Sequence, residues 1–138
     1  MHRRLNGIIM DRKIIHTHNA PGAVGTYNQA VQANGFIYTS GQVGLIPATG
    51  ELIEGGTSAE ALQALKNIRA ILEDAGSSLS GITKLTVYIV DIGEFSLVNE
   101  AFQEFFGDID FPARSTVEVS ALPIGARVEI DCVAVAGE

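Results

Sequence analysis

The sequence is poor in cysteine and in basic residues. Cys132 is the only cysteine, so no disulfide can form within the chain, and a reducing, cytoplasmic setting is expected. The apolar residues around Cys132 indicate a buried structural thiol. Lys and Arg together number 9 against 16 Asp and Glu, which gives a formal net charge of −7 at pH 7. Because binding to a phosphate backbone requires clustered basic side chains, no nucleic-acid partner is expected.

Long apolar runs are also missing. No run approaches the roughly 20 residues that a membrane-spanning helix needs, so no membrane association is expected. With 46% hydrophobic and 18% charged residues among 138, the composition is that of an ordinary globular protein of one domain. We assign this domain to residues 12–138. We expect residues 1–11 to form a flexible N-terminal extension, in which either Met1 or Met10 can be the true start.

Hydrophobic periodicity predicts strands and helices in an α+β arrangement. Apolar alternation and β-branched residues indicate strands over 13–17, 35–40, 43–46, 84–90, 114–119 and 127–132. Apolar residues at helical spacing indicate helices over 57–75 and 94–106. For the first helix, Thr57 and Glu60 predict a capping box at its start, and Gly76 predicts its end. In the second helix, the apolar residues expected to face inward are Phe95, Val98, Phe102 and Phe105.

Two helices can cover only one face of a sheet of five or six strands. The other face must contact water or a neighbouring molecule. Its predicted residues include Phe36, Tyr38, Val133 and Val135. An uncovered apolar patch of this kind usually marks association, so the pattern favours an oligomer without fixing the number of subunits.

The last two strands combine an apolar face with a polar one. In the first strand, one face carries Arg114, Thr116 and Glu118, and the other carries Ser115, Val117 and Val119. In the second strand, one face carries Arg127, Glu129 and Asp131, and the other carries Val128, Ile130 and Cys132. The apolar faces are expected to lie under the helices, and the polar faces either in water or against a partner subunit.

Arg114 is the strongest candidate for a binding residue. Its guanidinium is always charged and matches the planar geometry of a carboxylate. A desolvated arginine needs a partner, which can be a substrate carboxylate or, as a structural alternative, Glu118 or Glu129. Strand parity alone favours the structural ion pair.

Glu129 is a candidate proton-transfer group on the strand expected to lie next to Arg114. A carboxylate beside an apolar wall can have a raised pKa and exchange protons near neutral pH. The alternative is a solvated strand glutamate like Glu118, and spacing alone does not distinguish the two. His16 and His18 share one side of a strand, but they lack a nearby third ligand for a metal.

Several motifs together identify a family resemblance. The C-terminal part contains Pro112-Ala113-Arg114-Ser115, a Val-Glu-Val strand, a Leu-Pro turn and Val128-Glu129-Ile130. Earlier in the chain stand Asn19-Ala20-Pro21, Tyr27 in VGTYNQAV, Tyr38-Thr39-Ser40-Gly41-Gln42, Pro47-Ala48-Thr49-Gly50, and Val98-Asn99 before Phe105-Phe106. In order and approximate spacing, these motifs resemble the RidA (YjgF/UK114) family of enamine/imine deaminases over about residues 12–136.

The resemblance implies a fold, an assembly and a chemistry. It implies a chorismate-mutase-like α+β domain that assembles as a homotrimer with three clefts between subunits. The family hydrolyses reactive 2-enamine and 2-imine carboxylates, such as 2-aminoacrylate and 2-aminocrotonate, to 2-oxo acids and ammonia, without cofactor or metal. By matching position, Arg114 binds the substrate carboxylate and Glu129 positions the attacking water. The matching positions that line the cleft are Tyr27, Ser40, Gly41, Asn99 and the backbone of Thr116.

Two positions differ from the usual family pattern, and three other functions are open. Thr116 stands where many family members have cysteine, so a thiol nucleophile is not available at this position. Thr26 stands where a proline often precedes the tyrosine, which predicts a looser Tyr27 loop. The alternative functions are a deaminase of another unsaturated amino acid of the 2-aminomuconate type, a carboxylate-binding or chaperone-like protein without turnover, and a ribonuclease or translation inhibitor.

Overall fold

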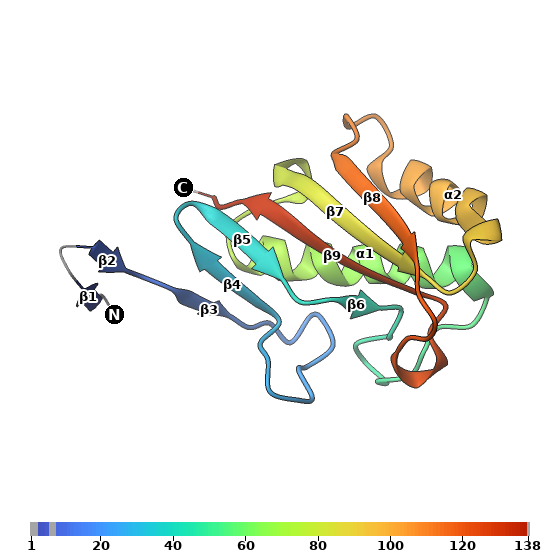
Figure 1. The fold of residues 1–138 in the computed structure, drawn as a ribbon, viewed down its shortest axis with the longest axis horizontal. Helices are drawn as coiled ribbons and strands as arrows, with labels where there is room; N and C mark the ends of the chain where they lie inside the picture. The colour runs from blue at the N-terminus through green and yellow to red at the C-terminus, as the bar shows by residue number, and fades with distance from the viewer. Residues whose placement is uncertain (1–2, 6–7, 138) are drawn as a thin grey trace.

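The computed structural model describes residues 3–5 and 8–137, and it contains a mixed seven-stranded sheet with two long helices on one face (Figure 1). The strands of this sheet are β3 (Lys13–Ile15), β4 (Ala30–Ala33), β5 (Phe36–Thr39), β6 (Gln42–Val43), β7 (Ile82–Ile89), β8 (Ala113–Glu118) and β9 (Val128–Val135). Their order is β3-β4-β5-β9-β7-β8, and β6 pairs with β9. Only β7 and β8 are parallel. The α+β class predicted from the sequence is therefore confirmed.

The N-terminal strands β1 (Arg3–Leu5) and β2 (Ile8–Met10) form a separate antiparallel pair. This hairpin falls within the extension that we predicted for residues 1–11. Residues 1, 2, 6 and 7 lie outside the described part of the chain. The mobility of the extension and its boundary at residue 11 therefore stay predictions.

Strand β4 was missed by the periodicity argument. Alanine and glutamine are weak strand formers, so Ala30–Ala33 carries little strand signal. The loop that joins β4 to β5 has a clearer sequence signal. Asn34 and Gly35 both have positive φ, at 51° and 85°, and they form the two-residue loop for which Asn-Gly is the favoured sequence.

Helix α1 (Gly56–Asp74) ends as predicted but begins differently. At its end, Gly76 has a φ of 84° and its N–H donates to the Glu73 carbonyl, which confirms the glycine stop. The predicted capping box is wrong, because the N-cap is Gly55 and no side chain caps the helix. Instead, Thr57 donates to Glu94, and Glu60 accepts from the Arg127 backbone N–H.

The core lies between the sheet and the helices α1 and α2 (Phe95–Phe106). As predicted, β7 buries one face through Leu85, Val87 and Ile89. In α2, Val98, Phe102 and Phe105 are buried as expected, but Phe95 is 42% exposed. No helix in the described ranges is both long enough and apolar enough to cross a bilayer.

The relation between the last two strands differs from the expected one. They are not neighbours, because β7 lies between β8 and β9. Strand β8 follows α2, which carries the chain back so that β8 runs parallel to β7 at the edge of the sheet. In register, Arg114 lies beside Leu85 and Thr116 beside Val87, so the polar face of β8 is on the helix side. The apolar Val117, expected under the helices, lies on the open side and is exposed.

Candidate active site

The Arg114 guanidinium is oriented by two polar side chains. Its Nη2 donates to Asn99 Oδ1 at 2.8 Å, and its Nε donates to Thr116 Oγ1 at 3.0 Å. Asn99 comes from α2, and Thr116 is two residues further along β8 on the same face. The structure thus brings together Arg114, Asn99 and Thr116. It also gives Thr116 a side-chain contact, whereas we expected its backbone to act.

Two aromatic rings pack against the same guanidinium. Arg114 Cζ lies 4.6 Å from the ring centroid of Phe102 and 5.0 Å from that of Phe95, within the range of cation–π attraction. Burial lowers the pKa of Arg114, but a guanidinium remains charged at any physiological pH. The sequence predicts Phe95 and Phe102 only as core residues. Their spacing from Asn99, however, places all three residues on one face of the helix.

Arg114 forms no ion pair with any carboxylate among the described residues. Glu118, one of the structural alternatives, instead accepts a hydrogen bond from the Ile92 N–H at 2.9 Å. Glu129, the other, lies on the opposite face of the sheet, beside Tyr88. The structural ion pair favoured by strand parity is therefore wrong, and the guanidinium is available to an external anion.

A cavity of about 280 Å³ opens beside this guanidinium. Its lining residues are Asn99, Phe102, Gln103, Phe111, Pro112 and Arg114. The cavity thus combines one fixed positive charge with two side-chain amides and the apolar side chains of Phe102, Phe111 and Pro112. Apolar walls with a few polar groups are the usual composition of a site for a small ligand. We call this part, with Thr116, the arginine half-site.

A second group of predicted residues lies around Glu129 on the open face. Burial, and then the charge of Asp131, raises the pKa of Glu129 above its ordinary value. Gly41 lies directly against this side chain, because a Cβ added to Gly41 would be only 2.7 Å from Glu129 Cδ. The glycine is therefore required for the close approach of the backbone to the carboxylate.

Tyr27 and Ser40 belong to the same region. The Tyr27 side chain is exposed, its hydroxyl accepts from the Val24 N–H at 3.4 Å, and it lines a small recess together with Gly41. The Ser40 hydroxyl donates to the Asn28 carbonyl at 2.5 Å, and so it ties the end of β5 to the Tyr27 loop. We call Tyr27, Ser40, Gly41 and Glu129 the glutamate half-site.

Sequence reasoning missed Gln29, which braces the Tyr27 loop. Its side chain is buried, its Nε2 donates to the carbonyls of Thr17 and Pro21 at 3.0 and 2.8 Å, and its Oε1 accepts from the Thr17 N–H at 2.7 Å. These bonds join the end of the loop to its beginning, and the looser Tyr27 loop expected from Thr26 stays a prediction. A glutamine two residues after the tyrosine carries no signal of burial in the sequence.

Cys132, the only cysteine of the chain, belongs to neither half-site. It is 2% exposed, and burial raises its pKa to about 12, so the thiol is not ionised at neutral pH. This confirms the prediction of a buried structural thiol. His16 and His18 form an edge-to-face ring pair, with centroids 4.9 Å apart.

Replacing Gly41 by alanine is expected to lower activity by about 10²-fold, the effect typical of a misplaced catalytic group. The new Cβ would push the Glu129 carboxylate aside, while the fold can adjust because a side chain, not backbone, is displaced. Steady-state kinetics and the unfolding midpoint would be measured together. Because the effect should act through Glu129, Gly41→Ala should cause no further loss in a Glu129→Ala background. A further loss there would contradict this explanation.

Replacing Glu129 by glutamine is expected to stabilise the protein at neutral pH. A raised pKa in the fold means that the charged carboxylate is disfavoured, and this cost is present above the folded pKa. When the pH falls below 4.5, the ordinary pKa of a glutamate, the carboxyl is protonated in both the folded and the unfolded state. The cost of burying its charge then disappears. Urea unfolding should therefore show a gain at about pH 7 that vanishes near pH 4. Glu54→Gln, at an exposed glutamate, is the control, and a gain independent of pH would contradict the prediction.

Comparisons with known proteins show similarity over nearly the whole chain. Residues 17–136 match the family model described as Endoribonuclease L-PSP. The chain is 47% identical over 126 residues to the Homo sapiens protein named 2-iminobutanoate/2-iminopropanoate deaminase, with 91% of each chain covered.

Solved structures give the same result. A Yersinia pestis protein of the conserved Rid family has 46% identity and a TM-score of 0.87, with 91% of this chain and 100% of that chain covered. Escherichia coli TdcF, solved with bound serine, has 39% identity and a TM-score of 0.85, with 91% and 98% covered. Sequence motifs, fold and similarity over nearly the whole length therefore agree that the chain belongs to the RidA family.

Proposed function

We propose that this protein is a deaminase that hydrolyses 2-enamine and 2-imine carboxylates to 2-oxo acids and ammonia. The observation that carries the proposal is the Arg114 guanidinium, which is charged, oriented by Asn99 and Thr116, and has no carboxylate partner among the described residues. A small carboxylate fits both its charge and its fork of donors. Relatives named 2-iminobutanoate/2-iminopropanoate deaminase, and TdcF with its bound amino acid, support this substrate class.

The reaction needs little beyond binding and proton transfer. The enamine first tautomerises to the imine, whose protonated C=N carbon is already electrophilic, so the mechanism uses no metal or cofactor. Arg114 holds the carboxylate, and Glu129 accepts a proton from the water that adds to this carbon. The glutamic acid then returns the proton to the nitrogen, the C–N bond breaks as the hydroxyl group loses its proton to the departing ammonia, and an ammonium ion and the 2-oxo acid leave. The raised pKa of Glu129 favours both transfers near neutral pH.

The two half-sites lie on opposite faces of the sheet, which suggests how they meet. Arg114 is on the helix side and Glu129 on the open side, so one chain does not join them. The open face also exposes Phe36, Tyr38 and Val135, an apolar surface of the kind that association covers. We therefore propose a homotrimer in which the arginine half-site of one subunit faces the glutamate half-site of the next. A cytoplasmic location is part of the same proposal.

Ammonia release from freshly generated imines tests the function. Threonine and a dehydratase would supply 2-iminobutanoate, and serine would supply 2-aminoacrylate. Formation of 2-oxo acid and ammonia should be faster with the protein than with a heat-denatured sample. A panel that includes 2-aminomuconate distinguishes the related deaminase. Binding of a 2-oxo acid without accelerated ammonia release would instead indicate a binding protein, and RNA cleavage would indicate the ribonuclease alternative.

A further inference from the structure

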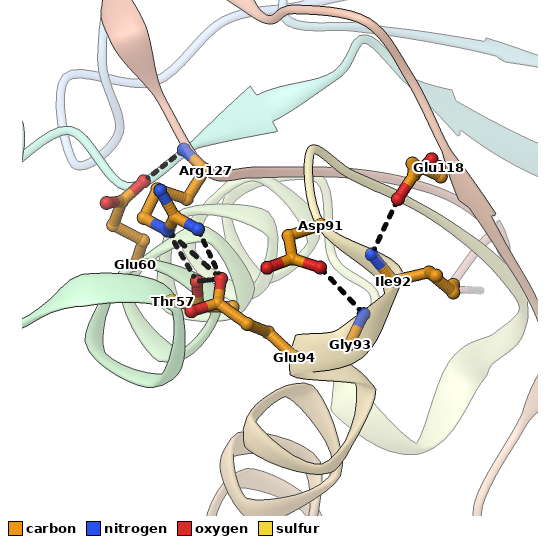
Figure 2. A network of polar contacts seen from close by, with 8 residues as sticks. All are labelled: Thr57, Glu60, Asp91, Ile92, Gly93, Glu94, Glu118 and Arg127. Atoms are coloured by element: carbon orange, nitrogen blue, oxygen red, sulfur yellow. Dashed lines mark hydrogen bonds and ion pairs between the residues drawn. The ribbon is translucent and has the colours of Figure 1, made fainter.

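The start of helix α2 is held by Thr57, Glu94 and Arg127, which we call the helix-start cluster (Figure 2). Glu94 Oε1 accepts from Arg127 Nη2 at 2.6 Å, from Arg127 Nε at 3.0 Å and from Thr57 Oγ1 at 2.7 Å. Three donors thus converge on one carboxylate oxygen. The hydrogen bonds from Thr57 and Arg127 lower the pKa of Glu94, so this side chain is charged at neutral pH.

The cluster connects three elements that are far apart in the sequence. Thr57 lies in the first turn of α1, Glu94 directly precedes α2, and Arg127 directly precedes β9. The Arg127 backbone N–H also donates to Glu60 Oε1 at 2.8 Å, so this arginine is fixed through both backbone and side chain (Figure 2). The position of Glu94 is therefore set by α1 and β9 together.

The same turn is also fixed to strand β8. Glu118, the last residue of β8, accepts from the Ile92 N–H at 2.9 Å, and Asp91 Oδ1 accepts from the Gly93 N–H at 2.9 Å (Figure 2). Since β8 also carries Arg114, the turn before α2 has a defined position relative to the strand of the arginine half-site.

Helix α2 carries three of the groups that surround Arg114. Phe95, Asn99 and Phe102 are spaced by four and three residues, so they share one face of the helix. Phe95 directly follows Glu94 and is the first residue of the helix. A rotation or shift of this first turn would change the ring contact of Phe95 and the hydrogen bond of Asn99 at the same time.

We propose that Glu94 and Arg127 are positioning residues for carboxylate binding, and that the helix-start cluster holds α2 so that Phe95 and Asn99 orient the Arg114 guanidinium. Neither residue lines the cavity beside Arg114, so both act through α2 and not on the ligand. This inference rests on the proposed function, because it assigns the cluster to the carboxylate site of that reaction.

Glu94→Gln tests the inference, because it keeps the shape of the side chain and removes its charge. The Kd for 2-oxobutanoate is expected to rise about fivefold, the upper end for loss of a solvent-exposed ion pair. KM should rise with it, while kcat should change by less than about twofold, because lost ground-state binding raises KM alone. Glu100→Gln, at an exposed glutamate on the same helix, is the matched control and should leave binding unchanged.

A spectroscopic readout separates positioning from general stability. The NMR signal of Arg114 Nε–Hε, identified by its loss in Arg114→Lys, should shift and broaden in Glu94→Gln but not in Glu100→Gln. Adding Glu94→Gln to Asn99→Ala should weaken binding less than Glu94→Gln does in the wild-type protein, because the hydrogen bond of Asn99 is already lost and only the Phe95 contact is left to change. Additive losses, or an unchanged Arg114 signal beside a lowered unfolding midpoint, would overturn the inference. If wild-type protein binds 2-oxobutanoate but releases no ammonia, the proposed function fails, while the Arg114 signal still decides the role of the cluster.

Discussion

Replacing Arg114 by alanine is expected to lower kcat/KM for 2-iminobutanoate by about 10²–10⁴-fold, which corresponds to the roughly 3–5 kcal/mol lost when one partner of a buried ion pair is removed. The substrate carboxylate would lose both its counter-charge and its two-pronged hydrogen bond. It would then stand in a cavity that holds no other positive charge among its lining residues. Ammonia release at several substrate concentrations would measure the effect.

Arg69→Ala provides a matched control for this variant. Arg69 also packs over an aromatic ring, with its Cζ 5.1 Å from the centroid of Phe105, but it does not line the cavity. Its replacement removes a comparable cation–π contact and should leave kcat/KM nearly unchanged. Arg114→Lys should recover only part of the activity, because an ammonium group lacks the planar fork. Wild-type rates in Arg114→Ala would rule out the proposed carboxylate site.

Mixing two inactive variants should restore activity. In Arg114→Ala the arginine half-site is lost, and in Glu129→Gln the glutamate half-site is lost. If each cleft takes one half-site from each of two neighbouring subunits, random exchange of equal amounts leaves both halves intact in about one half times one half, or a quarter, of the clefts. Activity near a quarter of the wild-type value is therefore expected after subunit exchange.

Two controls make the mixing experiment decisive. Each variant taken alone through the same exchange procedure should remain inactive. A double variant with both substitutions, mixed with wild-type protein, reports the extent of exchange through the loss of wild-type clefts. Absence of recovery after verified exchange would show that each cleft is built within one chain. Tyr27→Ala can replace Glu129→Gln in the same test, because both residues belong to the glutamate half-site.

The local elements were predictable because each depends on a pattern within a short stretch of sequence. The alternation of Leu85, Val87 and Ile89 indicates β7. Gly76 indicates the end of α1, because glycine readily adopts the positive φ that ends a helix. Strand β4 escaped because its alanines have little strand preference of their own. It forms because the Asn34-Gly35 turn places it against β5.

The arrangement of the strands was not predictable from the same patterns. Parity correctly grouped Arg114 with Thr116, but it does not say which face the helices cover. That depends on the crossover through α2, which inserts no strand between β7 and β8 and leaves β9 on the far side of β7. The placement of Arg114 and Glu129 on opposite faces therefore follows from long-range pairing and not from local periodicity.

The candidate site shows a similar division. The family resemblance pointed to Arg114, Asn99 and Thr116, and the structure places them in contact. The contacts of other residues near the start of α2 depend on the tertiary structure. Thr57 and Glu60 have the spacing of a capping box, yet their side chains contact Glu94 and the Arg127 backbone, because these groups approach from other elements. Spacing alone cannot anticipate competition from a distant donor.

The central position of β9 has a consequence for how the protein is made. This strand is the last of the sheet to leave the ribosome, yet it lies between β5 and β7 and bridges the two parts of the sheet. Until it emerges, β7 has no partner on the side away from β8, and Leu85 and Val87 cannot be fully enclosed. The nascent chain must therefore carry exposed apolar surface from the emergence of β7 until that of β9, and the sheet is completed only after translation has passed β9.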